Sequence, residues 1–201
     1  MRDEVAPGRP REFDETEMLR KIMRLFWRGG YEGVSLADIM SETGLKKGSL
    51  YAAYGDKRAM YLKALAQYED DVVASAAKFL MDQEIPALER ISAFLSAPLN
   101  GPEQGDRSGC FLCNASADQA DLNDDAQAQV SRGFERLRQG LGVSVQQLRP
   151  DLSDTEISAK AQTFLSLYIG LRILVRSGAD VSQLRESVEL GCRLVDVDIA
   201  K

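Results

Sequence analysis

The sequence lacks histidine altogether, and its 201 residues include only three cysteines and one tryptophan. Without histidine the chain has neither the commonest general base nor the usual nitrogen ligand of a metal ion, so we expect no metal and no cofactor. An odd number of cysteines argues against a disulfide framework and agrees with a reducing compartment. A helical enzyme that uses a carboxylate or a cysteine is a remote alternative, because the sequence shows no Gly-rich phosphate loop and no G-x-S-x-G elbow.

Long hydrophobic runs are also missing. No stretch approaches the ~18 apolar residues that a membrane span needs, and the polar N-terminus lacks the apolar block of a signal peptide. We therefore expect a cytoplasmic protein with no membrane partner. The contents of 44% hydrophobic and 28% charged residues are ordinary for a globular protein, and the length suffices for one large domain or two modest ones.

The net charge of −6 is unevenly distributed along the chain. Residues 1–63 carry 12 Lys and Arg against 10 Asp and Glu, a balance of +2, so the remaining residues carry −8. A slightly basic first part and an acidic second part indicate two functions in one chain.

The segment 34–57 reads V-S-L-A-D-I-M-S-E-T-G-L-K-K-G-S-L-Y-A-A-Y-G-D-K. Ser35 followed by Asp38 predicts a capped helix from about Leu36, and Gly44 is placed to end it. A second short helix should begin near Lys46, with four polar or cationic side chains on its outer side: Lys46, Lys47, Ser49 and Tyr51. Two short helices around a glycine turn are the helix-turn-helix layout, in which the second helix enters the major groove of DNA. The same layout also occurs in helical interaction proteins that never bind DNA.

A further helix should precede this pair. Asp14 and Glu17 form a predicted capping box, and Gly29-Gly30 end the helix. The three helices should bury one set of side chains against one another: Ile22, Phe26, Leu36, Ile39, Leu45, Leu50 and Tyr54. Residues 1–12 are expected to be a flexible basic arm, in which Arg9 and Arg11 could enter an A·T-rich minor groove.

The remaining residues also predict helices. A helix capped by Asp56 should run without a break to about Met81, and another should start after Pro86 and end before a loop at 98–108. Further helices are predicted at about 124–148, 155–177 and 181–197. Residues 164–175 are apolar on more than one face, which in a small domain requires cover on both sides. We therefore expect a homodimer through the last two helices, with the central helix of a monomeric bundle as the alternative.

Residues 14–65 resemble the TetR family of bacterial transcriptional regulators. The resemblance rests on L-F-W-R-G-G-Y-E-G-V-S-L-A-D-I-M-S-E-T-G-L-K-K-G-S-L-Y-A-A-Y-G-D-K-R-A-M-Y. It implies an all-α fold of about nine helices, with an N-terminal helix-turn-helix domain at 13–56 and a ligand-binding and dimerisation domain at 57–201. It also implies a repressor that binds an inverted-repeat operator and is released by a small-molecule effector.

Carried over by position, the resemblance implies that five residues contact the DNA backbone: Ser35, Lys47, Ser49, Tyr51 and Lys57. Lys46, at the head of the second short helix, is a plausible further contact. Ala52 and Ala53 depart from the family pattern, in which bulkier residues are frequent. The arm and the shape of the DNA would then supply part of the selectivity.

The effector site can be nominated by residue type alone, from aromatic side chains that could wall a cavity and polar groups that could orient a ligand: Phe94, Cys110, Phe111, Asn114, Phe134, Phe164 and Tyr168. Cys110 and Cys113 form a C-x-x-C without the further ligands that a zinc site needs. They are either a redox or electrophile sensor on the same scaffold or two small buried residues that line a core or pocket.

Overall fold

The computed structural model describes residues 13–103, 106–117 and 124–196, and within these ranges every regular element is helical. The helices are α1 (Glu15–Gly29), α2 (Leu36–Thr43), α3 (Lys47–Tyr54), α4 (Lys57–Tyr68), α5 (Ala74–Met81), α6 (Ala87–Glu103), α7 (Phe111–Ala117), α8 (Asp124–Leu148), α9 (Asp154–Arg176) and α10 (Val181–Arg193). A π-helical segment, Glu69–Val73, joins α4 to α5, so the described chain forms nine helical rods. None of these helices combines the length and the apolar content of a membrane span. The predicted all-α fold is confirmed.

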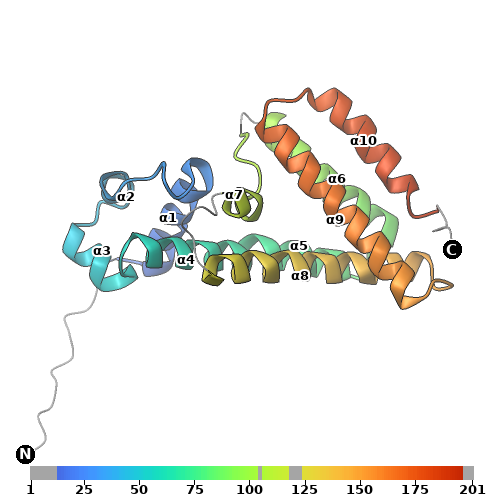
Figure 1. Ribbon diagram of the computed structural model, residues 1–201, viewed down its shortest axis with the longest axis horizontal. Coiled ribbons are helices and arrows are strands. Elements are labelled where there is room, and N and C mark those ends of the chain that lie inside the picture. Colours follow the sequence, from blue (N-terminus) through green and yellow to red (C-terminus); the bar gives the residue numbers. More distant parts are fainter. Residues whose placement is uncertain (1–12, 104–105, 118–123, 197–201) are drawn as a thin grey trace, which may run out of the picture.

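Helices α1 to α3, which we call the head, pack around a small apolar core at one end of the molecule (Figure 1). The Ser35 hydroxyl accepts from the Asp38 amide, and the Asp38 carboxylate accepts from the Ser35 amide, so the predicted capping box is present. Gly44 ends α2 at φ +70°, a conformation that costs glycine little. Of the seven predicted core residues, Leu36 and Leu45 are half-buried and the other five are buried.

Helix α4, the π-helical segment and α5 form one long rod that runs from the head along the rest of the molecule (Figure 1). The Asp56 carboxylate caps it by accepting from the Ala59 amide at 2.8 Å. The rod reaches Met81 as predicted, but the π-helical turn breaks the expected α-helical period. An ion pair between Arg20 of α1 and Asp71 in the π-helical segment, 2.8 Å between Nε and Oδ2, ties the head to this turn.

Helices α4 to α10 form the body, in which α8 lies along α5 while α6, α9 and α10 form a second group (Figure 1). The short helix α7 lies between the head and this group (Figure 1). Gly133 of α8 allows the close approach of α7, because a Cβ atom there would lie 2.6 Å from Leu112 Cδ1. The predicted helices at 124–148 and 155–177 are confirmed, although Phe134 on the expected buried side is only half-buried.

The predicted loop at 98–108 is wrong over its first half, because α6 continues through Pro98 and Pro102 to Glu103. Proline fixes φ near the helical value, so it fits a helix at the cost of one backbone hydrogen bond. The burial of Pro98 and Leu99 against the body favours continuation of the helix. Pro98 therefore lies in a buried part of the helix and Pro102 in its half-buried last turn, and the described part of the loop is confined to 106–110.

The last helix is shorter than predicted, because α10 ends at Arg193. Two cations bind backbone carbonyls just beyond this end. Lys160 Nζ donates to the Leu194 carbonyl at 2.9 Å, and Arg149 Nη1 donates to the Val195 carbonyl at 3.3 Å. These bonds satisfy acceptors that a longer helix would have used internally, and positive charge is favourable at this end of a helix. Val197, the predicted end, lies outside the described residues.

Candidate DNA-binding surface and the contact between head and body

Helix α3 buries one side and presents the other to solvent. Leu50 and Tyr54 are buried, while the four predicted contact residues are exposed: Lys46, Lys47, Ser49 and Tyr51. Lys47 Nζ lies 5.7 Å from the centre of the Tyr51 ring, so the amine and the aromatic side chain share one region of the surface. The exposed side of α3 therefore carries amine and hydroxyl groups, which are the side-chain groups that bind DNA phosphates.

The orientation of α3 is fixed by hydrogen bonds to both neighbouring helices. The Tyr54 hydroxyl donates to the Glu15 carbonyl at 2.9 Å, at the start of α1. Lys63 Nζ of α4 donates to the Ala53 carbonyl at 3.0 Å, near the end of α3. The exposed face of α3 is therefore held by a buried aromatic on one side and by the long rod on the other.

The remaining predicted DNA contacts are placed differently. Ser35 is exposed, but its hydroxyl is already used in the cap, where it donates to Asp38 Oδ2 at 2.6 Å. Lys57 begins α4 and is half-buried, with its amine 4.5 Å from the centre of the Tyr31 ring. Arg9 and Arg11 lie outside the described residues. All of these contacts stay predictions.

Gly48 is a candidate contact that the sequence reasoning did not single out. It lies in the first turn of α3 and is exposed, and a Cβ atom there would meet nothing within 4 Å. Glycine in an exposed helix costs about 1 kcal/mol relative to alanine, and no packing in the described chain requires it here. A glycine at such a position allows another molecule to approach the backbone closely, and its place beside Lys47 was the signal available in the sequence.

Helix α7 makes a second contact between the body and the head, in addition to the contact through α4. Asn114 of this helix is buried, and its Nδ2 donates to the Trp27 carbonyl of α1 and to the Ser108 carbonyl, both at 3.0 Å. The Trp27 ring packs edge-on against the Tyr68 ring of α4, with 4.9 Å between the ring centres. Asn114, which the sequence nominated as a ligand-binding residue, therefore joins the last turn of α1 to the segment before α7.

Next to the contact between Asn114 and Trp27 lies a buried group of two thiols, two tyrosine hydroxyls and one guanidinium. The Tyr68 hydroxyl donates to Cys110 Sγ at 3.6 Å, and Cys113 also donates hydrogen bonds to Cys110. From α9, Arg172 Nε donates to the Tyr168 hydroxyl at 2.9 Å. Cys110 is 2% exposed and Cys113 8%. Four elements therefore place these five side chains together: the turn at Cys110, α7, the end of α4 and α9.

The two thiols of this group have opposite acidities. Hydrogen bonds from Cys113, together with that from Tyr68 and the nearby Arg172 charge, lower the pKa of Cys110 to about 6 in spite of its burial. The Cys113 thiol donates to Cys110, and this bond and its burial raise the pKa of Cys113. Burial raises the pKa of Tyr168 to about 12 and also raises the pKa of Tyr68. The opposite directions of these two pKa shifts make Cys110 the more acidic thiol of the pair, and the nearby Arg172 cation favours its thiolate form.

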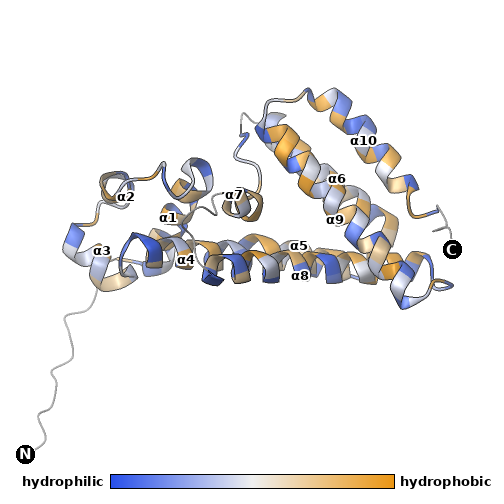
Figure 2. Ribbon diagram, in the orientation of Figure 1, coloured by the Kyte–Doolittle hydropathy of each residue, from blue (hydrophilic) through white to orange (hydrophobic). Residues whose placement is uncertain are grey.

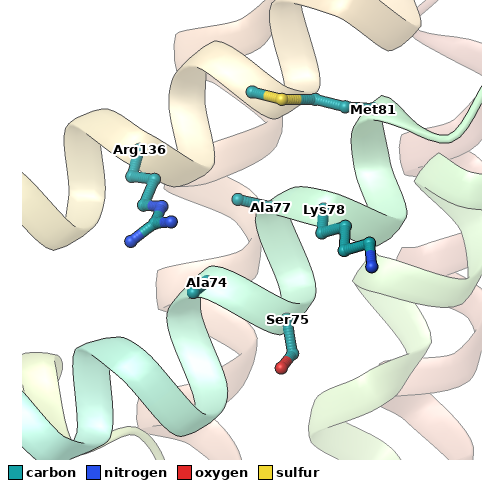
Figure 3. Close-up of a pocket in the computed structure, with 6 residues that line it drawn as sticks. All are labelled: Ala74, Ser75, Ala77, Lys78, Met81 and Arg136. Carbon is teal, nitrogen blue, oxygen red and sulfur yellow. The ribbon is translucent and has the colours of Figure 1, made fainter.

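The residues nominated for an effector site form part of the body core. Phe94 and Tyr168 stack with 4.1 Å between ring centres, and Phe111 and Phe164 are buried. Two open grooves lie elsewhere. A groove of about 420 Å³ between α5 and α8 is bordered by Lys78 and Arg136 (Figure 3), and another of about 550 Å³ lies beside the start of α9. None of the seven nominated residues lines either groove.

Comparison with known proteins agrees with this geometry. Residues 18–64 match the family model described as bacterial regulatory proteins, tetR family. The chain is 28% identical over 196 residues to the uncharacterised HTH-type transcriptional regulator YezE of Bacillus subtilis, covering 94% of this chain and all of YezE. It is also 28% identical to the HTH-type transcriptional repressor ComR of Escherichia coli, covering 93% of this chain and 91% of ComR.

Solved structures share the fold. The TetR family transcriptional regulator CifR, in a cysteine-substituted form complexed with 26-base-pair double-strand operator DNA, superposes with a TM-score of 0.79 at 24% identity. The match covers 92% of this chain and 98% of CifR. A helix-turn-helix head on a larger helical body, together with the family-model match and the similar HTH-type regulators, indicates a DNA-binding transcriptional regulator. The head therefore matches the tetR family model, and most of the chain is similar in sequence to HTH-type transcriptional regulators.

Proposed function

We propose that this regulator is a repressor that binds an inverted-repeat operator as a homodimer, with residues 13–56 as the DNA-binding domain and residues 57–201 as the effector-binding and dimerisation domain. The observation that carries the proposal is the exposed side of α3, which groups Lys46, Lys47, Ser49 and Tyr51 on a helix held from behind. The names of ComR, a repressor, and of the CifR complex with operator DNA add support.

In this proposal α3 enters the major groove, and the first-turn residues with Lys57 bind phosphates on either side of it. Arg9 and Arg11 of the N-terminal arm read the minor groove beside it, where a narrow A·T-rich groove attracts arginine. The two half-sites then lie about one helical turn apart, ~34 to 36 Å between centres.

The dimer uses α9 and α10. Large apolar side chains are exposed on both helices: Ile173 is 55% exposed, Leu174 45% and Leu190 63%. The C-terminal half of α9 is coloured mainly hydrophobic in Figure 2. Gly170 lies three and four residues before Ile173 and Leu174, on the same side of α9, and a Cβ atom there would meet nothing within 4 Å. A partner helix can therefore approach closely at a surface that is already apolar.

A small-molecule effector in the body would release the operator by changing the separation of the two heads. The α4–α5 rod, tied to α1 through Arg20 and Asp71, is the element that would transmit the change. The effector must bind more tightly to the spacing that does not fit DNA, so effector and operator weaken each other by the same factor.

The proposal is tested by selecting genomic fragments of the source organism on purified protein and measuring the mass of the protein in solution. We expect enrichment of one inverted repeat and a dimer at micromolar concentration. Ile173→Glu should yield monomers that bind the repeat at least tenfold more weakly. Leu88→Glu, a change of an exposed leucine on α6, is the matched control and should leave the dimer intact. No preference for any duplex over bulk competitor DNA would disprove the proposed function.

A further inference from the structure

We propose that Cys110 and Cys113 are a peroxide-reactive pair, which closes a reversible disulfide and thereby loosens the contact between the body and the DNA-binding head. The proposal rests on the DNA-binding function above for its effect on the operator, whereas the disulfide chemistry is independent of it.

The two sulfurs have the roles that such a reaction needs. Cys110 accepts hydrogen bonds from Cys113 and from the Tyr68 hydroxyl, and the guanidinium of Arg172 balances a negative charge on it. A thiolate, not a thiol, attacks peroxides, so Cys110 is the nucleophile. Cys113 keeps its proton and lies beside Cys110, in the place of a resolving thiol.

The reaction is balanced without a metal or a cofactor. The Cys110 thiolate attacks the terminal oxygen of a hydroperoxide and breaks the O–O bond, so that Cys110 becomes a sulfenic acid. The leaving alkoxide, or hydroxide if the oxidant is hydrogen peroxide, takes up one proton from the solvent and becomes an alcohol or water. The Cys113 sulfur then attacks the Cys110 sulfur, and water leaves with the Cys113 proton. The product is one S–S bond per chain, which an added dithiol reduces by thiol–disulfide exchange.

The two cysteines are close enough to form a disulfide, but only if their backbone positions shift. The Asn114 amide donates to the Cys110 carbonyl at 2.9 Å, so Cys110 to Asn114 form a helical turn. Side chains three residues apart on a helix have Cβ atoms ~5 to 6 Å apart, whereas a disulfide needs ~3.5 to 4.5 Å. Closing the bond therefore draws Cys113 toward Cys110 by about 1 to 2 Å.

This movement acts on the contact with the head. Asn114 follows Cys113 directly, and its side chain holds the Trp27 carbonyl of α1. At the same time the Tyr68 hydroxyl loses the Cys110 thiolate as its hydrogen-bond acceptor. Because the Tyr68 ring packs against the Trp27 ring, with 4.9 Å between ring centres, a shift of Tyr68 also disturbs Trp27. Arg172 loses its buried counter-charge. Oxidation therefore disturbs the Trp27 contact through both a hydrogen bond and a ring contact.

Digestion with trypsin separates the Cys110–Cys113 pair from Cys192, so the two sites can be measured independently. Cleavage after Arg107 and Arg132 leaves Cys110 and Cys113 on one peptide, and cleavage after Arg185 and Arg193 leaves Cys192 on another. The reduced full-length protein is treated with equimolar cumene hydroperoxide, blocked with N-ethylmaleimide, digested and weighed by mass spectrometry. We expect the peptide 108–132 to lose two hydrogen atoms and to take up no maleimide, while the peptide 186–193 is labelled.

Operator affinity and tryptophan fluorescence are measured on the same samples. Oxidation should weaken operator binding at least tenfold and shift the emission of Trp27, the one tryptophan of the chain, and dithiothreitol should reverse both changes. Failure of the reduced protein to bind any operator would refute the proposed function and leave the peptide result standing. A peptide 108–132 that still carries two maleimides, or that is oxidised without the internal link, would refute the disulfide.

Variants separate the disulfide from oxidation in general. In Cys113→Ser the sulfenic acid should persist at Cys110, be trapped by dimedone, and leave operator binding within twofold of that of the reduced protein. Cys192→Ser is the matched control and should respond to peroxide as the unmodified chain does. If Cys113→Ser loses operator binding to peroxide as completely as the unmodified chain, the disulfide is not the switch.

Discussion

Asn114 of α7 donates a hydrogen bond to the carbonyl of Trp27, 3.0 Å away in the last turn of α1. A second bond of the same length from the same Nδ2 reaches Ser108. One buried amide group thus joins the head, the segment before α7 and α7 itself. This link joins the head to α7, whereas the Arg20–Asp71 ion pair and the bond from Lys63 to the Ala53 carbonyl join the head to the rod.

Replacing this amide should cost both stability and communication between the domains. Asn114→Ala leaves the Trp27 and Ser108 carbonyls without this donor, and unmaking buried hydrogen bonds costs about 1 to 3 kcal/mol. We expect the free energy of unfolding, measured in urea, to fall by about this amount. We also expect the emission of Trp27 to change in the native state.

Ser116→Ala is the matched control for this prediction. The Ser116 hydroxyl donates to the Cys113 carbonyl at 2.8 Å, so its hydrogen bond lies within α7 and does not reach the described part of the head. Its loss should cost less stability and leave the Trp27 emission unchanged. Equal effects of the two substitutions would show that Asn114 stabilises α7 locally and does not link it to the head.

Lys47→Ala should weaken DNA binding on every sequence to a similar extent. A lysine that binds a phosphate releases counterions and reads no base, so its loss lowers affinity uniformly and reduces the slope of log affinity against log salt by about 1. Titrations at several salt concentrations, on operator and on unrelated duplex, measure both effects. Lys78→Ala, an exposed lysine on α5, is the matched control and should leave the slope unchanged.

Gly48→Ala should separate stability from DNA binding. Alanine is favoured over glycine in a helix by up to about 1 kcal/mol, and the new methyl group meets nothing in the protein. If Gly48 faces the DNA backbone, this variant gains thermal stability and loses operator affinity. Gly142→Ala in α8, where the added Cβ atom would lie 3.9 Å from Ile157 Cγ2, should gain stability without any loss of affinity. An unchanged affinity of Gly48→Ala would remove Gly48 from the interface.

Local signals were sufficient to predict the head. The Ser35 and Asp38 capping box, the positive φ of Gly44 and the buried side of α3 are all set by neighbours within a few residues, so their spacing in the sequence predicts them. The paired prolines of α6 misled the prediction, because tertiary burial of Pro98 outweighed the lost hydrogen bond. Local sequence preference therefore determines where a helix begins and ends only if tertiary packing does not oppose it.

The thiol group could be predicted only in part. The C-x-x-C spacing indicated that Cys110 and Cys113 share a turn, but Tyr68 and Arg172 are 42 and 62 residues away from Cys110 in sequence. No pattern within either segment shows that a hydroxyl and a guanidinium would lie beside the sulfur. The link between Asn114 and Trp27, 87 residues apart, is equally invisible to periodicity. These partners meet through the packing of α4, α7 and α9.

The acidity of Cys110 leads to a prediction about pH. Five groups lie together here: Cys110, Cys113, Tyr68, Tyr168 and Arg172. The pKa values of Cys113 and of both tyrosines are raised and that of Arg172 is raised, so only Cys110, with its pKa lowered to about 6, changes charge between pH 4 and about 8. Alkylation of Cys110 by iodoacetamide should therefore be half-maximal near pH 6, slow as protonation removes the thiolate below it, and reach a plateau above about pH 7.

Cys192 provides the internal control for this profile. Burial raises the pKa of Cys192, so its alkylation should still be increasing at pH 9, and the tryptic peptides 108–132 and 186–193 report the two sites from the same sample. Arg172→Gln removes the counter-charge of the thiolate and should move the Cys110 profile to higher pH without moving that of Cys192. If the two cysteines give the same pH profile in the unmodified chain, Cys110 is an ordinary buried thiol, and neither the charge pair nor the reactivity assigned to it exists.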